Sequence, residues 1–154
     1  MHVRQQVRNA VTSKLREIKS LKGSTHESMT YPLGKDDMPA ALVFSEEEVI
    51  ETVTKVGCRL QRRHIETAIY VFARADKEVE NVLDPLVAEV ENKIYEDQTL
   101  GRIAEQTQLS ETNLFIGGEP KSPVGAARLS FISTVYTKQG DAENAIINSG
   151  GPFS

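Results

Sequence analysis

Two side chains with the chemistry of a nucleophile and a base lie six residues apart, at Cys58 and His64. A thiol activated by a neighbouring imidazole is the arrangement that cysteine hydrolases use. The residues around the pair match no local signature of such enzymes, and Arg62 and Arg63 beside His64 disfavour the charged imidazole. The sequence therefore favours a small, partly buried cysteine and a surface histidine over a catalytic pair.

An acidic run at Glu46, Glu47 and Glu48 offers the oxygen ligands that cations prefer. Three successive carboxylates do not converge on one point, either on a strand or on a helix. We therefore expect no metal site here. A solvated sheet edge or a contact between subunits fits the run better.

A basic cluster follows at Arg59, Arg62 and Arg63, and arginines of this kind can bind phosphate. Alternation along a strand places Arg59 and Arg63 on one face and Arg62 on the other. Such an arrangement does not form a single row along a nucleic-acid backbone. An acidic partner in the same or a neighbouring subunit is favoured, so we expect the acidic run and the basic cluster to form complementary interfaces.

Sequence motifs of the common enzyme classes are missing. The chain has no phosphate-binding G-x-x-x-x-G-K-[ST] and no dinucleotide-binding G-x-G-x-x-G, and Lys121-Ser122 follow Gly117-Gly118 at the wrong spacing. It also has no H-E-x-x-H and no G-x-S-x-G. We expect no catalysis, no resident metal and no cofactor.

The length of 154 residues fits one domain, at most with a tail. Hydrophobic residues make up 39% and charged residues 26%, as in globular proteins. The formal charge of −4 opposes a dedicated nucleic-acid binder, and a single cysteine excludes a disulfide framework and a Cys-rich zinc site. No apolar run predicts a membrane span or a secretion signal, so we expect a reducing compartment or transport inside an assembly.

Apolar spacing predicts two main helices. One covers 3–22 and is followed by Gly23 as a candidate C-cap. The other covers roughly 78–96 and contains Pro85, so it either starts near Asp84 or is kinked there. A polar loop is expected over 23–38, with room for a short strand near Tyr31, and a short helical turn over 97–108.

Strand signals recur along the rest of the chain. Residues 39–44 form a short apolar run, 59–73 alternate between faces, and so do 126–137; 109–116 form a further candidate before a loop at 117–123. Residues 45–56 match both a helix with a Ser45–Glu48 capping box and a strand rich in β-branched residues, and we interpret them as a strand. The predicted fold is α+β: a mixed or antiparallel sheet of four to five strands, two main helices on one face, and an extended C-terminal tail.

The order of these pieces resembles the tail terminator family of long-tailed bacteriophages, the group of the lambda minor tail protein U, which has counterparts in gene transfer agents and tailocins. The resemblance covers roughly 3–137. It is carried by VRNAVTSKL, MPAALVF, HIETAIYVFA, the helix with Asp84, Leu86, Val90, Glu91 and Ile94, the Thr99-Leu100-Gly101 turn, and AARLSFISTVYT. The chain departs from the family over 45–64 and after Lys138, so family contacts in those regions do not carry over.

The resemblance implies a virion protein assembled in the host bacterial cytoplasm. In that family six subunits form a ring on the last ring of the tail tube, stop tube growth and present a surface to the head or neck, while DNA passes through the lumen. The alternative within virion proteins is a head-tail connector on the portal side. A DNA-contacting module and a small hydrolase are the alternatives from other classes, opposed by net charge and by the missing motifs.

We expect a domain over 1–138 and a C-terminal extension over 139–154, flexible unless a partner orders it. In a ring, this extension is expected to contact a neighbouring subunit. The candidate contact residues in it are Asp141, Ile146, Ile147 and Phe153.

Overall fold

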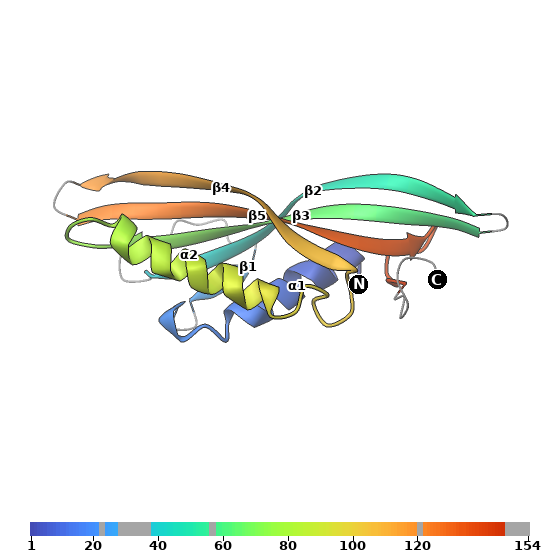
Figure 1. Ribbon diagram of the computed structural model, residues 1–154, viewed down its shortest axis with the longest axis horizontal. Coiled ribbons are helices and arrows are strands. Elements are labelled where there is room, and N and C mark those ends of the chain that lie inside the picture. Colours follow the sequence, from blue (N-terminus) through green and yellow to red (C-terminus); the bar gives the residue numbers. More distant parts are fainter. Residues whose placement is uncertain (22–23, 28–37, 56–57, 120–121, 147–154) are drawn as a thin grey trace.

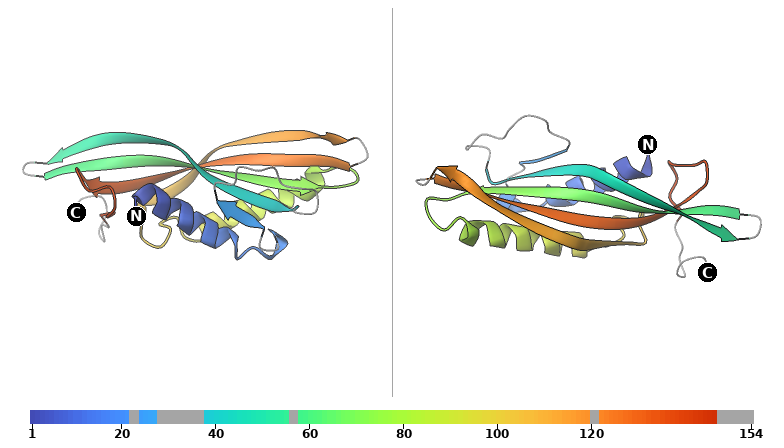
Figure 2. Two further views of the ribbon diagram at one scale, coloured as in Figure 1. Left: turned by 180° about the vertical axis from the view of Figure 1, so that it is seen from behind. Right: turned by 90° about the horizontal axis from the view of Figure 1, so that it is seen from above.

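The computed structural model describes residues 1–21, 24–27, 38–55, 58–119 and 122–146. Five strands form one sheet in the order β1-β2-β3-β5-β4, and the helices α1 and α2 lie on one side of it (Figures 1 and 2). The pairing of β1 with β2 is parallel and the other pairings are antiparallel. The predicted α+β class, with a mixed sheet and two main helices on one face, is confirmed.

Two long hairpins build most of the sheet. β2 (Ala40–Lys55) pairs with β3 (Cys58–Arg74), and β4 (Gln106–Glu119) pairs with β5 (Ser122–Lys138). β3 and β5 pair along almost their whole length and join the hairpins at the centre of the sheet. The two hairpin ends point in opposite directions along the long axis of the molecule (Figure 1).

The predicted strands at 39–44 and 45–56 form one element, β2, in which a bulge lies between Ser45 and Glu47. The helical alternative for this segment is wrong. Its β-branched residues pair with β3, and Glu48, the last residue of the suggested capping box, bonds to Arg63 on that strand. The bulge separates the sequence into an inner, buried half and an outer half with mostly exposed side chains.

The alternation predicted for 59–73 and 126–137 is confirmed, because successive side chains alternate between the face under the helices and the opposite face, which carries no helix and is called the open face here. The buried face of the sheet supplies Ala41, Val43, Ile65, Ile69, Val71, Ala73, Ala127, Leu129, Phe131 and Val135. The helices and the turn after them supply Val3, Val7, Val11, Leu15, Leu83, Leu86, Val87, Val90, Ile94 and Leu100. One core therefore lies between the helix layer and one face of the sheet.

The first helix is shorter than the 3–22 predicted. α1 ends at Leu15 (Val3–Leu15), and a 3-10 turn follows at Lys19–Leu21. Backbone N–H groups of Glu17 and Ile18 donate to carbonyls three residues earlier, which tightens the chain at the helix end. Ile18 and Leu21 remain buried through this turn, so the apolar periodicity continues beyond the helix itself.

The second helix, α2, spans Glu80–Tyr95 and contains Pro85. The helix thus begins before Pro85 and continues through it, so the predicted start near Asp84 is wrong, and a kink at Pro85 stays a prediction. Gly125 on β5 lies under its first turn, where an added Cβ would meet Val79 and Leu83 at 3.1–3.3 Å. The glycine lets the helix approach the sheet closely.

A tight turn at 97–103 connects α2 to β4. Leu100, Gly101 and Arg102 all have positive φ, a conformation that is unfavourable for the two that are not glycine. Asp97 holds the turn: its carboxylate accepts from the Thr99 hydroxyl (2.6 Å) and from the Gly101 N–H (2.9 Å). These hydrogen bonds, that from the Thr99 side chain first, hold the pKa of Asp97 below its ordinary value.

The fourth and fifth strands are longer than expected. β4 begins at Gln106, where a helical turn was predicted, and the predicted loop 117–123 largely continues the hairpin, with Glu119 opposite Ser122. A short strand, β1 (Thr25–Glu27), lies in the segment predicted as a polar loop. The short strand expected near Tyr31 stays a prediction. Gly23 and Tyr31 lie outside the described residues.

Residues 139–146 fold back onto the same chain. The N–H of Val3 donates to the Ala142 carbonyl (2.8 Å), and the N–H of Ile146 donates to the Tyr136 carbonyl (2.7 Å). The Gln6 side-chain amide also donates to the Glu143 carbonyl (2.7 Å). The described part of the expected C-terminal extension therefore contacts the start of α1 and the end of β5, and the domain boundary at 138 stays a prediction.

Candidate functional site

A buried ion pair joins the acidic run to the basic cluster inside one chain. Arg63 Nη1 donates to Glu48 Oε1 (2.9 Å), and both side chains are less than a tenth exposed. Arg63 also donates to the Thr137 hydroxyl (2.9 Å) and to the Gln61 side chain (3.2 Å). The other oxygen of Glu48 is buried and accepts no hydrogen bond in the described structure; Arg4 lies 3.7 Å from it.

A second ion cluster lies on the open face of the sheet, opposite the helices. Arg128 on β5 bonds to Glu66 on β3 (2.8 Å) and, across β3, to Glu46 at the β2 bulge. The hydrogen bond to Glu46, foremost, raises the pKa of Arg128 above its ordinary value. Burial alone would raise the pKa of Glu66, but hydrogen bonds from Arg128 and Ser130 outweigh it and hold that pKa below its ordinary value.

The remaining members of the two predicted clusters separate. Arg62 lies on the open face and donates to Glu51 (3.0 Å) and to the Tyr136 hydroxyl (3.0 Å), whereas Arg59 is exposed near the hairpin end. Glu47 is exposed and pairs in register with Glu66. The charge complementarity predicted between the two clusters is thus used within the subunit for Glu48, and their role in subunit or partner contacts stays a prediction.

Cys58 and His64 do not form a pair. They lie on the same strand, β3, and six residues of extended chain separate their Cα atoms by about 20 Å. The His64 ring lies against Thr134 (3.4 Å) and Glu51 (3.5 Å) instead. Among the described residues, no group of three or more His, Cys, Asp or Glu side chains is placed to hold a metal ion.

The predicted contact residues of the C-terminal extension are only partly described. Asp141 accepts hydrogen bonds from the Asn144 side chain (3.0 and 3.1 Å) and from the N–H of Glu143. The hydrogen bonds from Asn144, the larger cause, hold the pKa of Asp141 below its ordinary value. Ile146 is half-buried at the end of β5, and Ile147 and Phe153 lie outside the described residues.

Two shallow hollows are present on the described surface. One, of about 310 Å³, lies on the open face and is lined by Leu42, Phe44, Glu46, Tyr70 and Phe72. The rings of Phe44 and Tyr70 meet edge to face there, and Arg128 lies over Tyr70. This hollow has an aromatic wall and one charged corner, and the Glu46 carboxylate in that corner is already bonded to Arg128.

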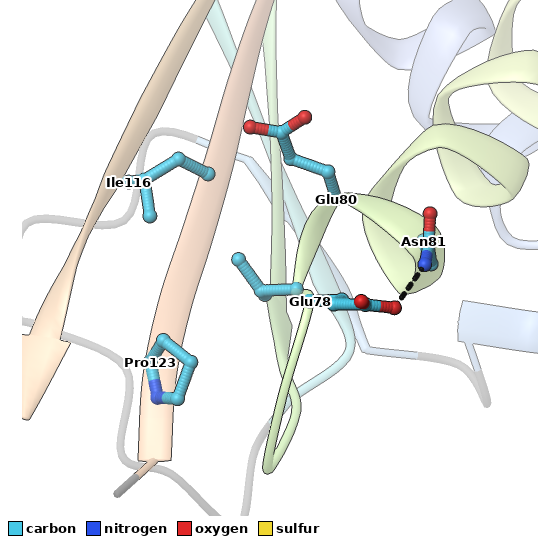
Figure 3. A pocket seen from close by; sticks show the side chains of 6 residues that line it. Glu78, Glu80, Asn81, Ile116 and Pro123 are labelled. Atoms are coloured by element: carbon cyan, nitrogen blue, oxygen red, sulfur yellow. Dashed lines mark hydrogen bonds between the residues drawn. The ribbon is translucent and has the colours of Figure 1, made fainter. Parts of the chain in front are cut away.

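The other hollow, of about 470 Å³, lies where the start of α2 approaches the β4–β5 hairpin (Figure 3). Ile116 and Pro123 line its hairpin side, and Glu78, Glu80 and Asn81 line its helix side. Glu78 accepts from the Asn81 amide (2.8 Å), so this carboxylate is engaged. The arrangement offers apolar surface rather than a set of reactive groups.

Exposed apolar side chains gather at two strand edges, a feature that the sequence patterns did not reveal. Leu114, Phe115 and Ile116 on β4, and Val49 and Ile50 on β2, are each between 45% and 55% exposed. In the sequence, these apolar residues are indistinguishable from those of strands buried in a core. Only the strand order shows that β4 and the outer half of β2 lie at sheet edges.

Comparisons with known proteins give a fold relationship. No family model and no curated protein matches the chain. The chain is similar to one in a solved structure described as "Virion of native gene transfer agent (GTA) particle". The TM-score is 0.52 and the sequence identity 11%, over 85% of this chain and 95% of that chain. At this identity, the likeness establishes a shared fold. None of the helices in the described ranges has the length and hydropathy of a membrane span.

Proposed function

We infer that this chain is a structural protein of a phage-like particle, located in the virion. The observation that carries this inference is the fold likeness to a chain of a gene transfer agent virion, which extends over most of both chains. The charged groups of the chain support it. Four charged side chains are engaged in hydrogen bonds to one another or to neighbouring side chains, as expected where charges hold strands together: Glu48, Arg63, Glu66 and Arg128.

Within this class, the role supported best is that of a tail terminator. Each main sequence piece that resembles that family coincides with one helix or strand of the structure, namely α1, β2, β3, α2 and β5. A terminator of this family forms a ring of six subunits that caps the tail tube, stops its polymerisation and gives the head or neck a surface for attachment. Its partners are further copies of itself, the tail tube protein and a neck protein.

The electrostatics fit a ring through which DNA passes without being held. The formal charge is −4, and Arg62, Arg63 and Arg128 are each bonded to a glutamate of the same chain. The excess of carboxylates opposes net attraction of the phosphate backbone, and binding that depends on phosphate neutralisation is then weak. The duplex would move through the lumen with little retention.

The test is assembly with a tail tube protein of the same particle. Light scattering measures the size of the purified chain alone and after mixing, and negative-stain images show the tube ends. We expect sixfold rings at the ends and tubes shorter than those formed by the tube protein alone, which is the control. A chain that stays monomeric and leaves tube length unchanged contradicts the proposal. Rings that bind only portal-side proteins would indicate a head-tail connector instead.

A further inference from the structure

Most of the large hydrophobic side chains that are exposed in the described part of the chain lie on two strands at opposite sides of one sheet. Five of the eight large hydrophobic side chains exposed in the described residues belong to them. We call residues 112–118 of β4 the β4 edge and residues 47–53 of β2 the β2 edge. Within the described part of the chain, neither segment pairs with a strand on its outer side, since β1 reaches only Ala41–Val43 of β2.

The β4 edge has none of the features that normally protect a free strand edge. Its seven residues (TNLFIGG) include no charged residue and no proline, and 114–116 are apolar and exposed. Open, apolar edges of this kind pair with other strands unless charges, prolines or covering elements prevent it. A partner strand is therefore the simplest cover for this edge in the assembled protein.

Charge determines which edge can serve as the partner strand. The β2 edge carries Glu47, Glu48 and Glu51, so two β2 edges side by side would place carboxylates against carboxylates. The uncharged β4 edge presents no such repulsion. A β2 edge therefore pairs more favourably with a β4 edge than with another β2 edge.

Strand direction and side-chain alternation also match. Through the chain of antiparallel pairings, β4 runs opposite to β2, so a neighbour's β2 added beyond β4 would continue the antiparallel pattern. Val49 and Phe115 lie on the open face, and Ile50 and Leu114 lie on the helix face. An antiparallel register with Val49 opposite Phe115 then places Ile50 opposite Leu114, with apolar contacts on both faces.

The stagger between the two edges is suited to ring closure. Val49 on β2 pairs with His64 on β3, which in turn pairs with Thr134 on β5. Phe115 on β4 pairs with Ala126 on β5, eight residues before Thr134. Joining the edges therefore displaces the next copy by eight residues, or about 26 Å, along the strands. A sheet that closes on itself requires a stagger of this sort, and a contact between two different surfaces generates rings.

We propose that the β2 edge of one copy adds to the β4 edge of the next, with Val49 opposite Phe115, so that neighbouring copies share one continuous sheet. This proposal names the ring contact of the function proposed above and rests on it. The hollow between α2 and the hairpin lies at the same end, and Ile116 lines it. A neighbouring copy would cover that apolar surface as well.

Cysteine cross-linking tests the contact directly. In a Cys58→Ser background, Val49→Cys and Phe115→Cys are made separately and together, and the proteins are assembled and then oxidised. We expect covalent dimers from the mixture of the two single variants but not from either variant alone. The variant with both cysteines should give a ladder of covalent oligomers that ends at the size of the ring. Dimers from Phe115→Cys alone would overturn the proposal in favour of β4–β4 pairing, and assembled rings without cross-links would overturn it as well.

Charge substitution provides an independent test. Leu114→Glu together with Ile116→Glu should abolish assembly, because it places two carboxylates beside the acidic β2 edge of the neighbouring copy. Val82→Glu is the matched control, since Val82 is similarly exposed but lies on α2. Rings that form normally in the double glutamate variant contradict the edge contact while leaving the terminator function in place. Cross-linked oligomers that do not affect tail tubes contradict the terminator function while leaving the edge contact in place.

Discussion

At the scale of single residues, the ion pair between Arg63 and Glu48 links the β2–β3 hairpin to β5 and to the start of α1. Arg63 bonds to Glu48 on β2 and to Thr137 on β5, and Arg4 on α1 lies near the same carboxylate. One buried guanidinium therefore connects two strands and approaches a helix. Such pairs add little relative to an apolar core, but removing one partner leaves the other charge buried and unpaired.

Arg63→Ala should therefore lower the free energy of unfolding by about 3–5 kcal/mol, because Glu48 loses its close partner. Replacing both residues with apolar ones, as in Arg63→Met with Glu48→Leu, should recover most of that loss. Urea denaturation of the single and double variants measures the effect. Arg62→Ala is the control, since its pair with Glu51 is exposed to solvent. Equal midpoints for Arg63→Ala and Arg62→Ala would contradict this role.

The sequence predicted which faces the arginines occupy but not what they bind. Alternation correctly separates Arg63 from Arg62, because the period of a strand is local. The partner of Arg63 depends on the register between β2 and β3, which includes a bulge at Glu46. A bulge shifts side chains by one residue and leaves no clear pattern in a run of three glutamates. The cluster around Arg128 was missed for the same reason, since it joins residues from three strands.

At the scale of elements, α2 approaches β5 closely at Gly125. Gly125 has no side chain, and the first turn of α2 occupies the space above it. This contact fixes how the helix meets the β4–β5 hairpin and hence shapes the hollow beside Ile116. Gly117, on the neighbouring strand, has no atom within 4 Å of an added Cβ and provides a natural comparison.

Gly125→Val should lower the free energy of unfolding by about 1–3 kcal/mol, because the added methyl groups overlap Val79 and Leu83. Gly117→Val should leave the stability of the subunit nearly unchanged, because its new side chain enters open space. Thermal and urea denaturation of both variants provide the comparison. A Gly125→Val protein as stable as the Gly117→Val protein would show that α2 can move away at no cost.

Element types were predictable from sequence, whereas element lengths were less so. The apolar period of α1 continues through Ile18 and Leu21, although the helix itself ends at Leu15, because a 3-10 turn keeps these residues in the core. The glycines and prolines of 117–123 indicate a loop, yet most of this segment belongs to a hairpin. Long-range pairing with β5 overrides these local signals.

At the scale of the whole molecule, the segment after β5 closes the fold. Residues 139–146 bond to the start of α1 at Val3 and Gln6, and to β5 at Tyr136. The beginning and the end of the described chain are thereby joined over one end of the core. The extension that the sequence indicates as a partner-binding tail thus also contributes contacts within its own subunit.

Removing residues 139–154 should lower the free energy of unfolding by about 2–3 kcal/mol, because several backbone hydrogen bonds to α1 and β5 are lost. Removing only 147–154 is the control and retains all of those bonds. Urea denaturation measures the stability, and amide hydrogen exchange in α1 shows where the loss occurs. If the two truncated proteins unfold at the same denaturant concentration, the segment does not hold α1.

The strand order also determines how the chain must fold. Each hairpin joins strands that are neighbours in sequence, so both can form rapidly and independently. Pairing of β3 with β5 must instead close the long connection over 75–123, which includes α2, and contacts of this separation slow folding. We expect the rate-limiting event to be the docking of two preformed hairpins. Until then, two additional strand edges, those of β3 and β5, remain exposed in the cell.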